Sequence, residues 1–262
     1  MNEFENLISL LESPNKENFS LGLVVAQNYK KEIFEYFGCE LEELEELAEF
    51  LKKNGIWNRK NIFDATELYV QNTWLAEFPK SLCSLVKLKI LDLGWNKIES
   101  LHTEIRKLKD LEELDLTYNL LKQLPSQITT LKNLRILCLS DNCFNSFPDG
   151  INSLKNLEEL YLSNNRIESI PKQIKNLTNL RRLNLASNQI QNLPIEIRNL
   201  INLEDLYLYN NQLKTIPIEI GNLTNLLELD ISNNQIPQSE IENIKKMLPN
   251  CNILAECQNE RI

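Results

Sequence analysis

One interval dominates this sequence: leucines of the same phase recur every 23 residues through most of the chain. The recurring leucine is found at Leu88, Leu111, Leu134, Leu157, Leu180, Leu203 and Leu226. A fixed interval of this length indicates tandem copies of one structural unit, and such copies fold by stacking on their neighbours. What one copy can form therefore decides the fold of the whole array.

Each copy keeps the same places apolar. In LEELYLSNNRIESIPKQIKNL these places are Leu157, Leu160, Leu162, Ile167, Ile170, Ile174 and Leu177, with Asn165 and Pro171 between them. The copy that begins at Leu203 matches every one of them, and a fainter copy begins at Ala65, where Thr73 replaces the asparagine. We count eight units over residues 65–236, the first degenerate and the last truncated.

The first half of each unit predicts a strand. Residues around Leu160 and Leu162 alternate between apolar and polar, as in a strand with one buried face, and the pair Asn164 and Asn165 indicates a turn. More than a dozen residues separate one strand from the next, which excludes hairpins and predicts parallel pairing.

An asparagine recurs in the turn of each complete unit. The column consists of Asn96, Asn119, Asn142, Asn165, Asn188, Asn211 and Asn234. A buried amide destabilises the fold unless its hydrogen bonds are made. We therefore expect these side chains to bond backbone groups that the turn leaves free.

The string LxxLxLxxNxLxxLPxxIxxLxN resembles the leucine-rich repeat. Its LPxxI half resembles the 23-residue class found in intracellular Ras-interacting and Scribble-like proteins and in many bacterial repeat proteins. The resemblance covers about residues 65–236 and implies an α/β fold: a right-handed solenoid with a concave parallel sheet and short turns or 3₁₀ segments on the convex side. His102 stands where later copies have proline, and we expect only a local change there.

Residues 1–64 lack the repeat and predict a helical N-terminal cap. The expected helices cover Asn2–Leu11, residues 15–27, Lys31–Phe37 and Leu41–Lys53. The side chains expected to cover the first repeat are Leu7, Leu10, Phe34, Phe37, Leu44, Leu47 and Trp57. The alternative is that this helical region is itself a docking module.

Residues 237–262 predict a short C-terminal cap. Pro237 interrupts the repeat, Ser239 and Glu242 have the spacing of a capping box, and a helix is expected from Glu240 to Leu248. A final short strand is expected at Ile253 and Leu254.

The net charge of −9 disfavours nucleic acid and anionic membranes as partners and is compatible with a basic protein or peptide. The N-terminal sequence lacks the positive charge of a signal peptide, and the apolar runs are too short to span a bilayer. We therefore expect a cytoplasmic protein, with export without a cleaved signal as the alternative.

The six cysteines show neither a CxxC pair nor zinc-ligand spacing, so we expect reduced thiols. The alternative is a disulfide between Cys251 and Cys257, which would suit an exported protein.

The outward residues of the strands are free to vary and are therefore the candidate binding surface. The predicted partner-binding residues are Tyr69, Trp74, Asp92, Trp95, Asp115, Tyr118, Tyr161, Arg182, Tyr207, Tyr209 and Asp230. Exposed aromatic side chains among carboxylates are typical of protein-binding surfaces. The alternative is that aromatic residues simply suit strands and shield the leucines beside them. Glu112, Glu158 and Glu204 are expected to lie on a solvated face.

Neither catalysis nor a metal site is predicted, and no cofactor is expected. Asp92 and Asp115 should lie roughly 5 Å apart on neighbouring strands. Such a pair could bind calcium or act in acid–base catalysis, but it more often faces water or a basic partner. Cys138 is the thiol of the strand face, and the repeat places His102 on the opposite side, so no Cys–His dyad is expected.

The leading hypothesis is a non-enzymatic interaction scaffold that binds a protein or peptide on an acidic, aromatic concave face. The alternative is a bacterial effector or surface-associated protein that binds a host protein. An enzyme similar to the bacterial ubiquitin ligases that carry leucine-rich repeats is disfavoured, because too little chain follows Ile236 for a catalytic domain. The sequence leaves the oligomeric state open.

Overall fold

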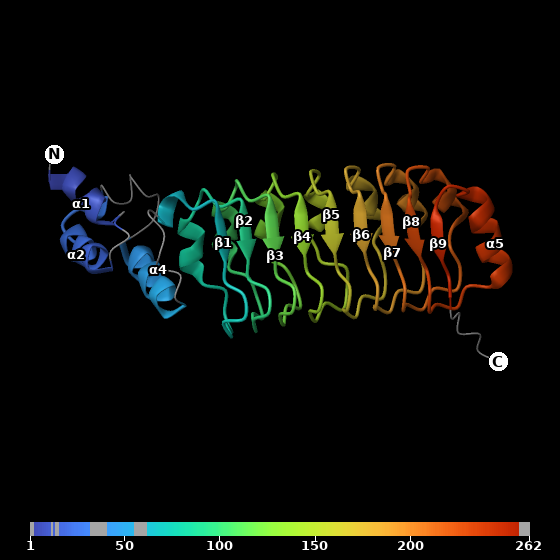
Figure 1. Cartoon of the computed structure of the whole chain (residues 1–262), viewed down its shortest axis with the longest axis horizontal. Helices are drawn as coiled ribbons and strands as arrows, with labels where there is room; N and C mark the ends of the chain where they lie inside the picture. Colours follow the sequence, from blue (N-terminus) through green and yellow to red (C-terminus); the bar gives the residue numbers. More distant parts are fainter. Residues whose placement is uncertain (1–2, 12, 14–15, 32–40, 55–61, 257–262) are drawn as a thin grey trace.

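The computed structural model describes residues 3–11, 13, 16–31, 41–54 and 62–256 of the 262-residue chain. In these residues nine parallel strands pair in chain order into a single sheet that runs along an elongated body (Figure 1). The strands are β1 (Glu67–Tyr69), β2 (Ile90–Asp92), β3 (Glu113–Asp115), β4 (Ile136–Cys138), β5 (Glu159–Tyr161), β6 (Arg182–Asn184), β7 (Asp205–Tyr207), β8 (Glu228–Asp230) and β9 (Asn252–Leu254). The parallel solenoid predicted from the repeat is confirmed.

The return path of each unit passes through a short 3₁₀ helix behind the sheet (Figure 1). These helices are η1 (Ile62–Asp64), η2 (Lys80–Ser84), η3 (Thr103–Lys107), η4 (Ser126–Thr130), η5 (Ile151–Ser153), η6 (Lys172–Asn176), η7 (Ile195–Asn199) and η8 (Ile218–Asn222). Proline precedes most of them, for example Pro171 with φ −73°. Its ring fixes the extended φ that the entry to each helix needs.

His102 takes the place of proline before η3 and adopts a similar φ of −76°. Its ring Nδ1 accepts a hydrogen bond from the backbone N–H of Glu104 at 3.1 Å. A side-chain cap thus replaces the fixed proline ring, and the local change expected at His102 is confirmed.

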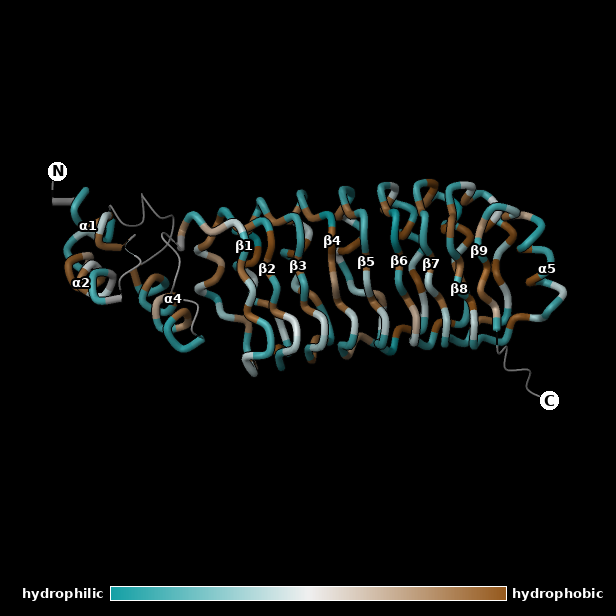
Figure 2. The backbone as a smooth tube through the Cα atoms, viewed as in Figure 1, coloured by the Kyte–Doolittle hydropathy of each residue, from teal (hydrophilic) through white to brown (hydrophobic). Residues whose placement is uncertain are grey.

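The leucine and isoleucine columns form one continuous core along the array, and apolar segments recur in each turn of the chain (Figure 2). The middle residue of every strand from β1 to β8, such as Leu160, is fully buried. Burying one such side chain stabilises the fold by about 1.5–3 kcal/mol. Because the partners of each side chain lie in adjacent units, the array is stabilised as a stack.

The asparagine column bonds to the backbone as predicted. The Oδ1 atom of Asn165 accepts from the backbone N–H of Phe144 in the preceding unit at 3.0 Å, and its Nδ2 donates to the carbonyls of Leu139 and Leu162. Asn119, Asn142, Asn188, Asn211 and Asn234 repeat this pattern. Each asparagine therefore ties its turn to the unit before it.

The same geometry explains the degenerate first unit. Among the described residues β1 is the first strand of the sheet, so position 73 has no earlier turn to which an asparagine could bond. Thr73 instead donates its backbone N–H to Oδ1 of Asn96 in the next unit.

Three helices of the N-terminal region are described: α1 (Glu3–Leu11), α2 (Lys16–Ala26) and α4 (Leu41–Lys53). The helix predicted over Lys31–Phe37 lies outside the described residues except for Lys31, which is helical. None of the helices in the described part of the chain has the length and apolar composition needed to cross a bilayer.

Helix α4 packs against both the solenoid and the other N-terminal helices. Its Leu47 and Leu51 belong to the core of the solenoid, whereas its Leu44 packs with Leu7 of α1 in a separate small core. Glu43 of α4 forms further links, with its carboxylate 3.1 Å from Nζ of Lys80 and 3.4 Å from Nζ of Lys107.

This arrangement corrects the predicted cover of the first repeat. Leu47 takes part in the solenoid core as expected, but Leu7 and Leu44 do not, because α4 turns one side toward the repeats and another toward α1 and α2. Leu10 is half-buried. The predicted contributions of Phe34, Phe37 and Trp57 lie outside the described residues.

At the other end, α5 (Gln238–Met247) packs on the last units, and β9 pairs with β8. The short strand predicted at Ile253 and Leu254 is confirmed. The predicted capping box of Ser239 and Glu242 is wrong: Pro237 precedes the helix without a side-chain cap. Glu240 instead accepts hydrogen bonds from Thr215 Oγ1 and the backbone N–H of Ile216, both at 2.6 Å.

Candidate functional site

The strand register aligns the outward residues into two columns, which together we name the strand face. The first column is Glu67, Ile90, Glu113, Ile136, Glu159, Arg182, Asp205 and Glu228. The second column is Tyr69, Asp92, Asp115, Cys138, Tyr161, Asn184, Tyr207 and Asp230. The residue between the two columns is buried in each of these strands, so both columns share the outer side of the sheet.

A third column lies in the turns after the strands, includes the predicted residues Trp95 and Tyr118, and has an unusual backbone. The residue before each position of the asparagine column has a φ between 52° and 57°: Asn72, Trp95, Tyr118, Asp141, Asn164, Ser187, Asn210 and Asn233. Asparagine and aspartate tolerate this left-handed conformation, whereas bulky aromatic residues rarely adopt it. Trp95 and Tyr118 therefore carry strain on the order of 1–3 kcal/mol each.

These two rings belong to an exposed aromatic cluster. The ring centroids of Trp95 and Tyr118 are 3.7 Å apart with the planes inclined by 18°. Trp74, whose φ is 60°, is 71% exposed, and Nζ of Lys97 lies 4.6 Å from its ring centroid. These side chains and Asp141 line a recess of about 530 Å³ at the carboxyl ends of the first strands, which we name the aromatic recess.

Two carboxylates of the strand face lie close to this recess. Asp92 accepts from the backbone N–H of Gly94 at 2.9 Å, and Asp115 accepts from that of Thr117 at 2.8 Å. A Cβ atom on Gly94 would be 3.2 Å from Asp92 Oδ1 and 3.7 Å from Asp115 Oδ1. A side chain at position 94 would therefore crowd the Asp92 carboxylate.

Negative charge accumulates on this half of the strand face. Burial raises the pKa of Glu113, and the neighbouring carboxylates of Asp115 and Asp92 raise it further. Burial also raises the pKa of Asp115 despite its hydrogen bonds from Thr117. In the described part of the chain no lysine or arginine forms an ion pair with Asp92, Glu113 or Asp115.

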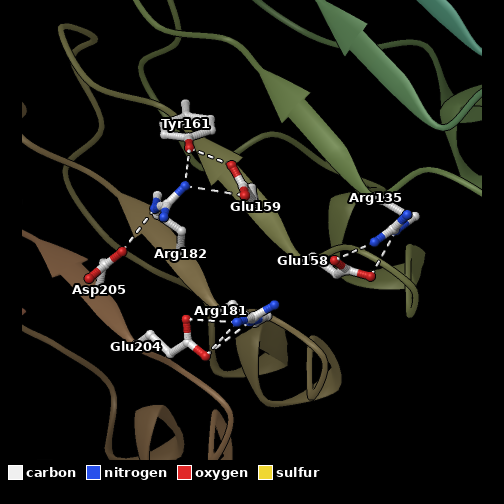
Figure 3. Close-up of polar contacts among 8 residues, drawn as sticks. All are labelled: Arg135, Glu158, Glu159, Tyr161, Arg181, Arg182, Glu204 and Asp205. Carbon is white, nitrogen blue, oxygen red and sulfur yellow. Dashed lines mark hydrogen bonds and ion pairs between the residues drawn. The ribbon is translucent and has the colours of Figure 1, made fainter. Parts of the chain in front are cut away.

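Over β5–β7 the strand face pairs its carboxylates with a cation of its own (Figure 3). The guanidinium of Arg182 donates to Tyr161 Oη at 3.2 Å and to Asp205 at 2.9 Å, and its Nη1 lies 3.2 Å from Glu159. The Tyr161 hydroxyl in turn donates to Glu159 at 2.5 Å. Burial and this hydrogen bond raise the pKa of Tyr161 to about 12. Arg182 and Tyr161 are thus held in a fixed network.

The remaining predicted residues lie farther toward the C-terminus. Tyr207 and Asp230 align on β7 and β8 and are half-buried, and Tyr209 follows β7 and is 37% exposed. The predicted set therefore divides into a recess with neighbouring carboxylates near β1–β3 and residues in or near the Arg182 network of β5–β7.

The face predicted to be solvated at Glu112, Glu158 and Glu204 is partly exposed, but its glutamates are paired with cations. Each glutamate forms an ion pair at 2.8 Å with a basic residue of the preceding unit, namely Lys89, Arg135 and Arg181 (Figure 3 shows the last two). The sequence contains the signal, because basic and acidic residues alternate at this position from one unit to the next. The pairs are partly exposed and stabilise the array only modestly.

A second asparagine column lies on the return path and was not predicted from the sequence. Asn133, Asn156, Asn179, Asn202 and Asn225 each donate to a backbone carbonyl of the preceding unit. Their regular spacing is visible in the sequence, but these amides are exposed, so burial alone gave no reason to expect the bonds.

Cys138 on strand β4 and His102 in the return path lie in different parts of their units. Burial and nearby carboxylates raise the pKa of Cys138, which disfavours the thiolate. His102 lies in the return path, where its ring caps η3. Among the described residues no three His, Cys, Asp or Glu side chains are grouped so that they could hold a metal ion. The strand face presents charged, hydrogen-bonding and aromatic side chains.

The sequence matches a family model described as a leucine-rich repeat region at residues 76–187 and 165–254. A comparison with curated proteins gives no match.

Several solved structures are similar. Internalin C2 from Listeria monocytogenes is 28% identical, with 74% of this chain and 81% of that chain covered and a TM-score of 0.63. The plant peptide hormone receptor RGFR1 in complex with RGF2 is 27% identical, with 69% and 34% covered and a TM-score of 0.54. A leucine-rich repeat protein of Leptospira interrogans is 33% identical, with 72% and 66% covered and a TM-score of 0.41. The chain thus spans about a third of the receptor chain and just under two thirds of the Leptospira chain.

Proposed function

The chain belongs to the leucine-rich repeat proteins, and from that premise we propose that it is a non-enzymatic scaffold that binds a protein or peptide on its strand face. The proposed surface comprises the aromatic recess and the outward residues of β1–β8. A rigid stack suits this role, because little conformational entropy is lost when a partner docks on it.

The observation that carries the proposal is the presence of Trp95 and Tyr118 at turn positions with positive φ. Their side chains are 56% and 41% exposed, so burial does not account for them, and the left-handed backbone disfavours them. Large exposed aromatic residues supply contact area to a protein partner at small entropic cost. Binding therefore accounts for both the exposure and the strain.

The similar structures support a peptide or protein as the partner. The plant receptor among them is a peptide hormone receptor in complex with RGF2. The charge of this chain favours a basic partner, because Asp92, Glu113 and Asp115 lie together in the half of the strand face beside the recess.

The test compares partner capture by the wild-type chain and by a double variant, Trp95→Asn with Tyr118→Asn. Asparagine is the residue that other units place at the same turn, so the variant keeps a compatible backbone. Crosslinked partners are recovered from the source cell and identified by mass spectrometry. The proposal expects the double variant to lose the partner that the wild-type chain captures.

Ile218→Asn is the matched control. Ile218 is also a large exposed apolar residue, at 74%, but it begins η8 behind the sheet. Capture should survive in this control. Capture that survives in the double variant and fails in the control would assign binding to the return path instead.

We also propose a cytoplasmic location. Cys83, Cys138, Cys143 and Cys251 carry free thiols, which suits a reducing compartment. Cys257, the alternative partner of Cys251, lies outside the described residues. Fractionation of the source cell tests the location, and recovery of the protein outside the cell would favour the effector or surface-associated alternative.

A further inference from the structure

Strand β1 repeats the side-chain set of strand β5, which lies four units farther along the array. The sequence of β1, Glu67 to Tyr69, is identical to that of β5, Glu159 to Tyr161. In both strands the tyrosine hydroxyl bonds the glutamate two residues earlier, at 3.3 Å in β1 and 2.5 Å in β5. The two strands thus present the same pair of acceptors on the same column positions.

In β5–β7 this set surrounds a guanidinium that the chain itself supplies. Arg182 projects from β6 between β5 and β7 and bonds Tyr161 on one side and Asp205 on the other (Figure 3). Its Nη1 also lies 3.2 Å from Glu159. The acceptors around one planar cation are therefore a glutamate, a tyrosine hydroxyl and a second carboxylate two strands away.

In β1–β3 the acceptors are present and the arginine is replaced. Ile90 of β2 occupies the position that Arg182 has in β6, and Glu113 of β3 occupies the position that Asp205 has in β7. The second column adds Asp92 and Asp115, where β6 and β7 have Asn184 and Tyr207. This part of the strand face thus carries more negative charge than its counterpart and has an apolar side chain where its counterpart has the cation.

The exposure of the tyrosines and the charge around Glu113 also distinguish β1–β3 from β5–β7. Tyr69 is 49% exposed, whereas Tyr161 is half-buried beside Arg182. Burial raises the pKa of Glu113, and repulsion from the carboxylates of Asp115 and Asp92 raises it further. A cation placed over Ile90 would relieve that repulsion.

We propose that the face of β1–β3 binds an arginine side chain of the partner. The guanidinium takes the place that Arg182 occupies in β5–β7: it donates to Glu113 and to the Glu67 and Tyr69 pair, with its alkyl stem over Ile90. The aromatic recess lies at the carboxyl ends of the same strands and receives the residues that flank this arginine. The inference rests on the proposed function and names the chemical group that the partner supplies.

The geometry around Arg182 in β5–β7 favours an arginine over a lysine as the group that binds to β1–β3. Arg182 uses Nε toward Asp205 and Nη1 toward Tyr161 and Glu159, so its donors diverge across two strand spacings. The planar fork of a guanidinium provides such divergent donors, whereas an ammonium is a compact point charge.

The probe is N-acetyl-arginine amide, titrated into the full chain labelled with ¹³C at its isoleucine methyl groups. Ile90 and Ile136 report, because they flank Glu113 on β2 and β4. The neutral analogue N-acetyl-citrulline amide is the matched ligand control, and N-acetyl-lysine amide tests the choice of arginine. We expect saturable shifts of both methyl signals with arginine and none with citrulline. Equal shifts with citrulline, or no shift with arginine, would overturn the proposal.

Two variants locate the site. Ile90→Arg supplies the arginine from the chain itself and should abolish the arginine-induced shift at Ile136. Glu113→Gln should weaken arginine binding by about threefold to tenfold, as expected for one half-exposed charged hydrogen bond. A thermal melt of each variant confirms that it is folded. Undiminished arginine binding by both folded variants would place the cation elsewhere and contradict the proposal.

The partner capture assay, run in parallel, separates this inference from the proposed function. If the wild-type chain captures its partner but the arginine amide gives no shift, the arginine site is wrong and the scaffold function stands. If arginine binds as expected but no partner is captured, the arginine site stands and the scaffold function fails.

Discussion

The ring of Trp95 stacks on the ring of Tyr118, with centroids 3.7 Å apart, although both residues have a left-handed backbone with φ of 57° and 54°. A stacked aromatic pair contributes on the order of 0.5–1.5 kcal/mol, which is no more than the strain of two such residues. The pair therefore adds little to folding stability. Its exposure beside a recess makes it available to a partner.

The first prediction follows from this balance. Replacing Trp95 and Tyr118 by asparagine should not lower the free energy of unfolding by more than about 1 kcal/mol, because the relieved strain is at least as large as the lost stacking. Urea denaturation measures the difference. A loss of several kcal/mol would assign the pair a structural role.

The second prediction concerns the two asparagine columns. Asn165→Ala leaves the N–H of Phe144 and the carbonyls of Leu139 and Leu162 without their buried partner, so it should destabilise the fold by about 2–4 kcal/mol. Asn156→Ala is the control, since it removes one exposed bond to Lys132 and should cost less than about 1 kcal/mol. Equal losses in urea denaturation would contradict the assigned role of burial.

The third prediction concerns the link between α4 and the repeats. Burial opposes the charge of Glu43, but its hydrogen bond from Lys80 and the charge of Lys107 outweigh that effect and hold its pKa below the ordinary value of 4.5. Glu43→Gln should therefore destabilise the fold by about 1 kcal/mol at neutral pH.

Because the pKa of Glu43 is lowered in the folded state, its contribution to stability depends on pH. A carboxyl whose pKa is lowered in the folded state stabilises the fold above its unfolded pKa, and this contribution is lost as the pH falls through the folded value. Denaturation curves of the wild type and the Glu43→Gln variant should therefore converge below pH 4.5. Glu42→Gln, which removes an exposed pair with Lys30, serves as the control with little expected effect.

The fourth prediction concerns partner binding and pH. Glu113 and Asp115 have raised pKa values, so they become protonated at a higher pH than ordinary glutamate and aspartate. The carboxylates that face them are those of Glu67, Asp92 and Glu159. Binding of a cationic partner should therefore weaken as the pH falls through these raised values, starting above the ordinary 4.5 of glutamate.

Folding stability should move in the opposite direction over the same range. A raised carboxyl pKa destabilises the fold at higher pH, and protonation relieves this cost as the pH falls. Binding titrations and denaturation curves over a pH series measure both trends. The double variant Glu113→Gln with Asp115→Asn should bind weakly with a flatter pH profile, and an unchanged profile would contradict the assignment.

The repeated fold follows directly from the sequence because its period is visible. A leucine that recurs every 23 residues predicts which residues are buried, and the strand register follows from the same phase, so Tyr69 and Tyr161 could be placed in one column in advance. The asparagine bonds were also predictable, since a buried amide must be satisfied.

The helical region lacks such a period, and there the prediction was wrong in part. Leu44 and Leu47 both belong to the apolar side of α4, and only the packing of α1 and α2 decides that the first joins the small core and the second joins the solenoid. A helical pattern identifies an apolar side but not the partner that covers each part of it.

The alignment of the outward residues on the strand face was predictable from the sequence, but the contacts among their side chains were not. The sequence places Arg182 and Ile90 at the same position of different units, yet only the side-chain geometry shows that Arg182 is held by Tyr161 and Asp205. The sequence also carries a signal for the positive φ of Trp95, because other units have asparagine or aspartate at the same position, but the conformation itself emerged only from the structure.

The central claim is that the partner docks on the strand face beside the aromatic recess, and site-specific photocrosslinking tests it most directly. A photoreactive phenylalanine is placed at Tyr69 on β1 in one variant and at Ile218 on η8 in another, since both positions are exposed and lie on opposite sides of the sheet. The account predicts a covalent adduct with the captured partner from position 69 and none from position 218. Adducts from position 218 alone would contradict it.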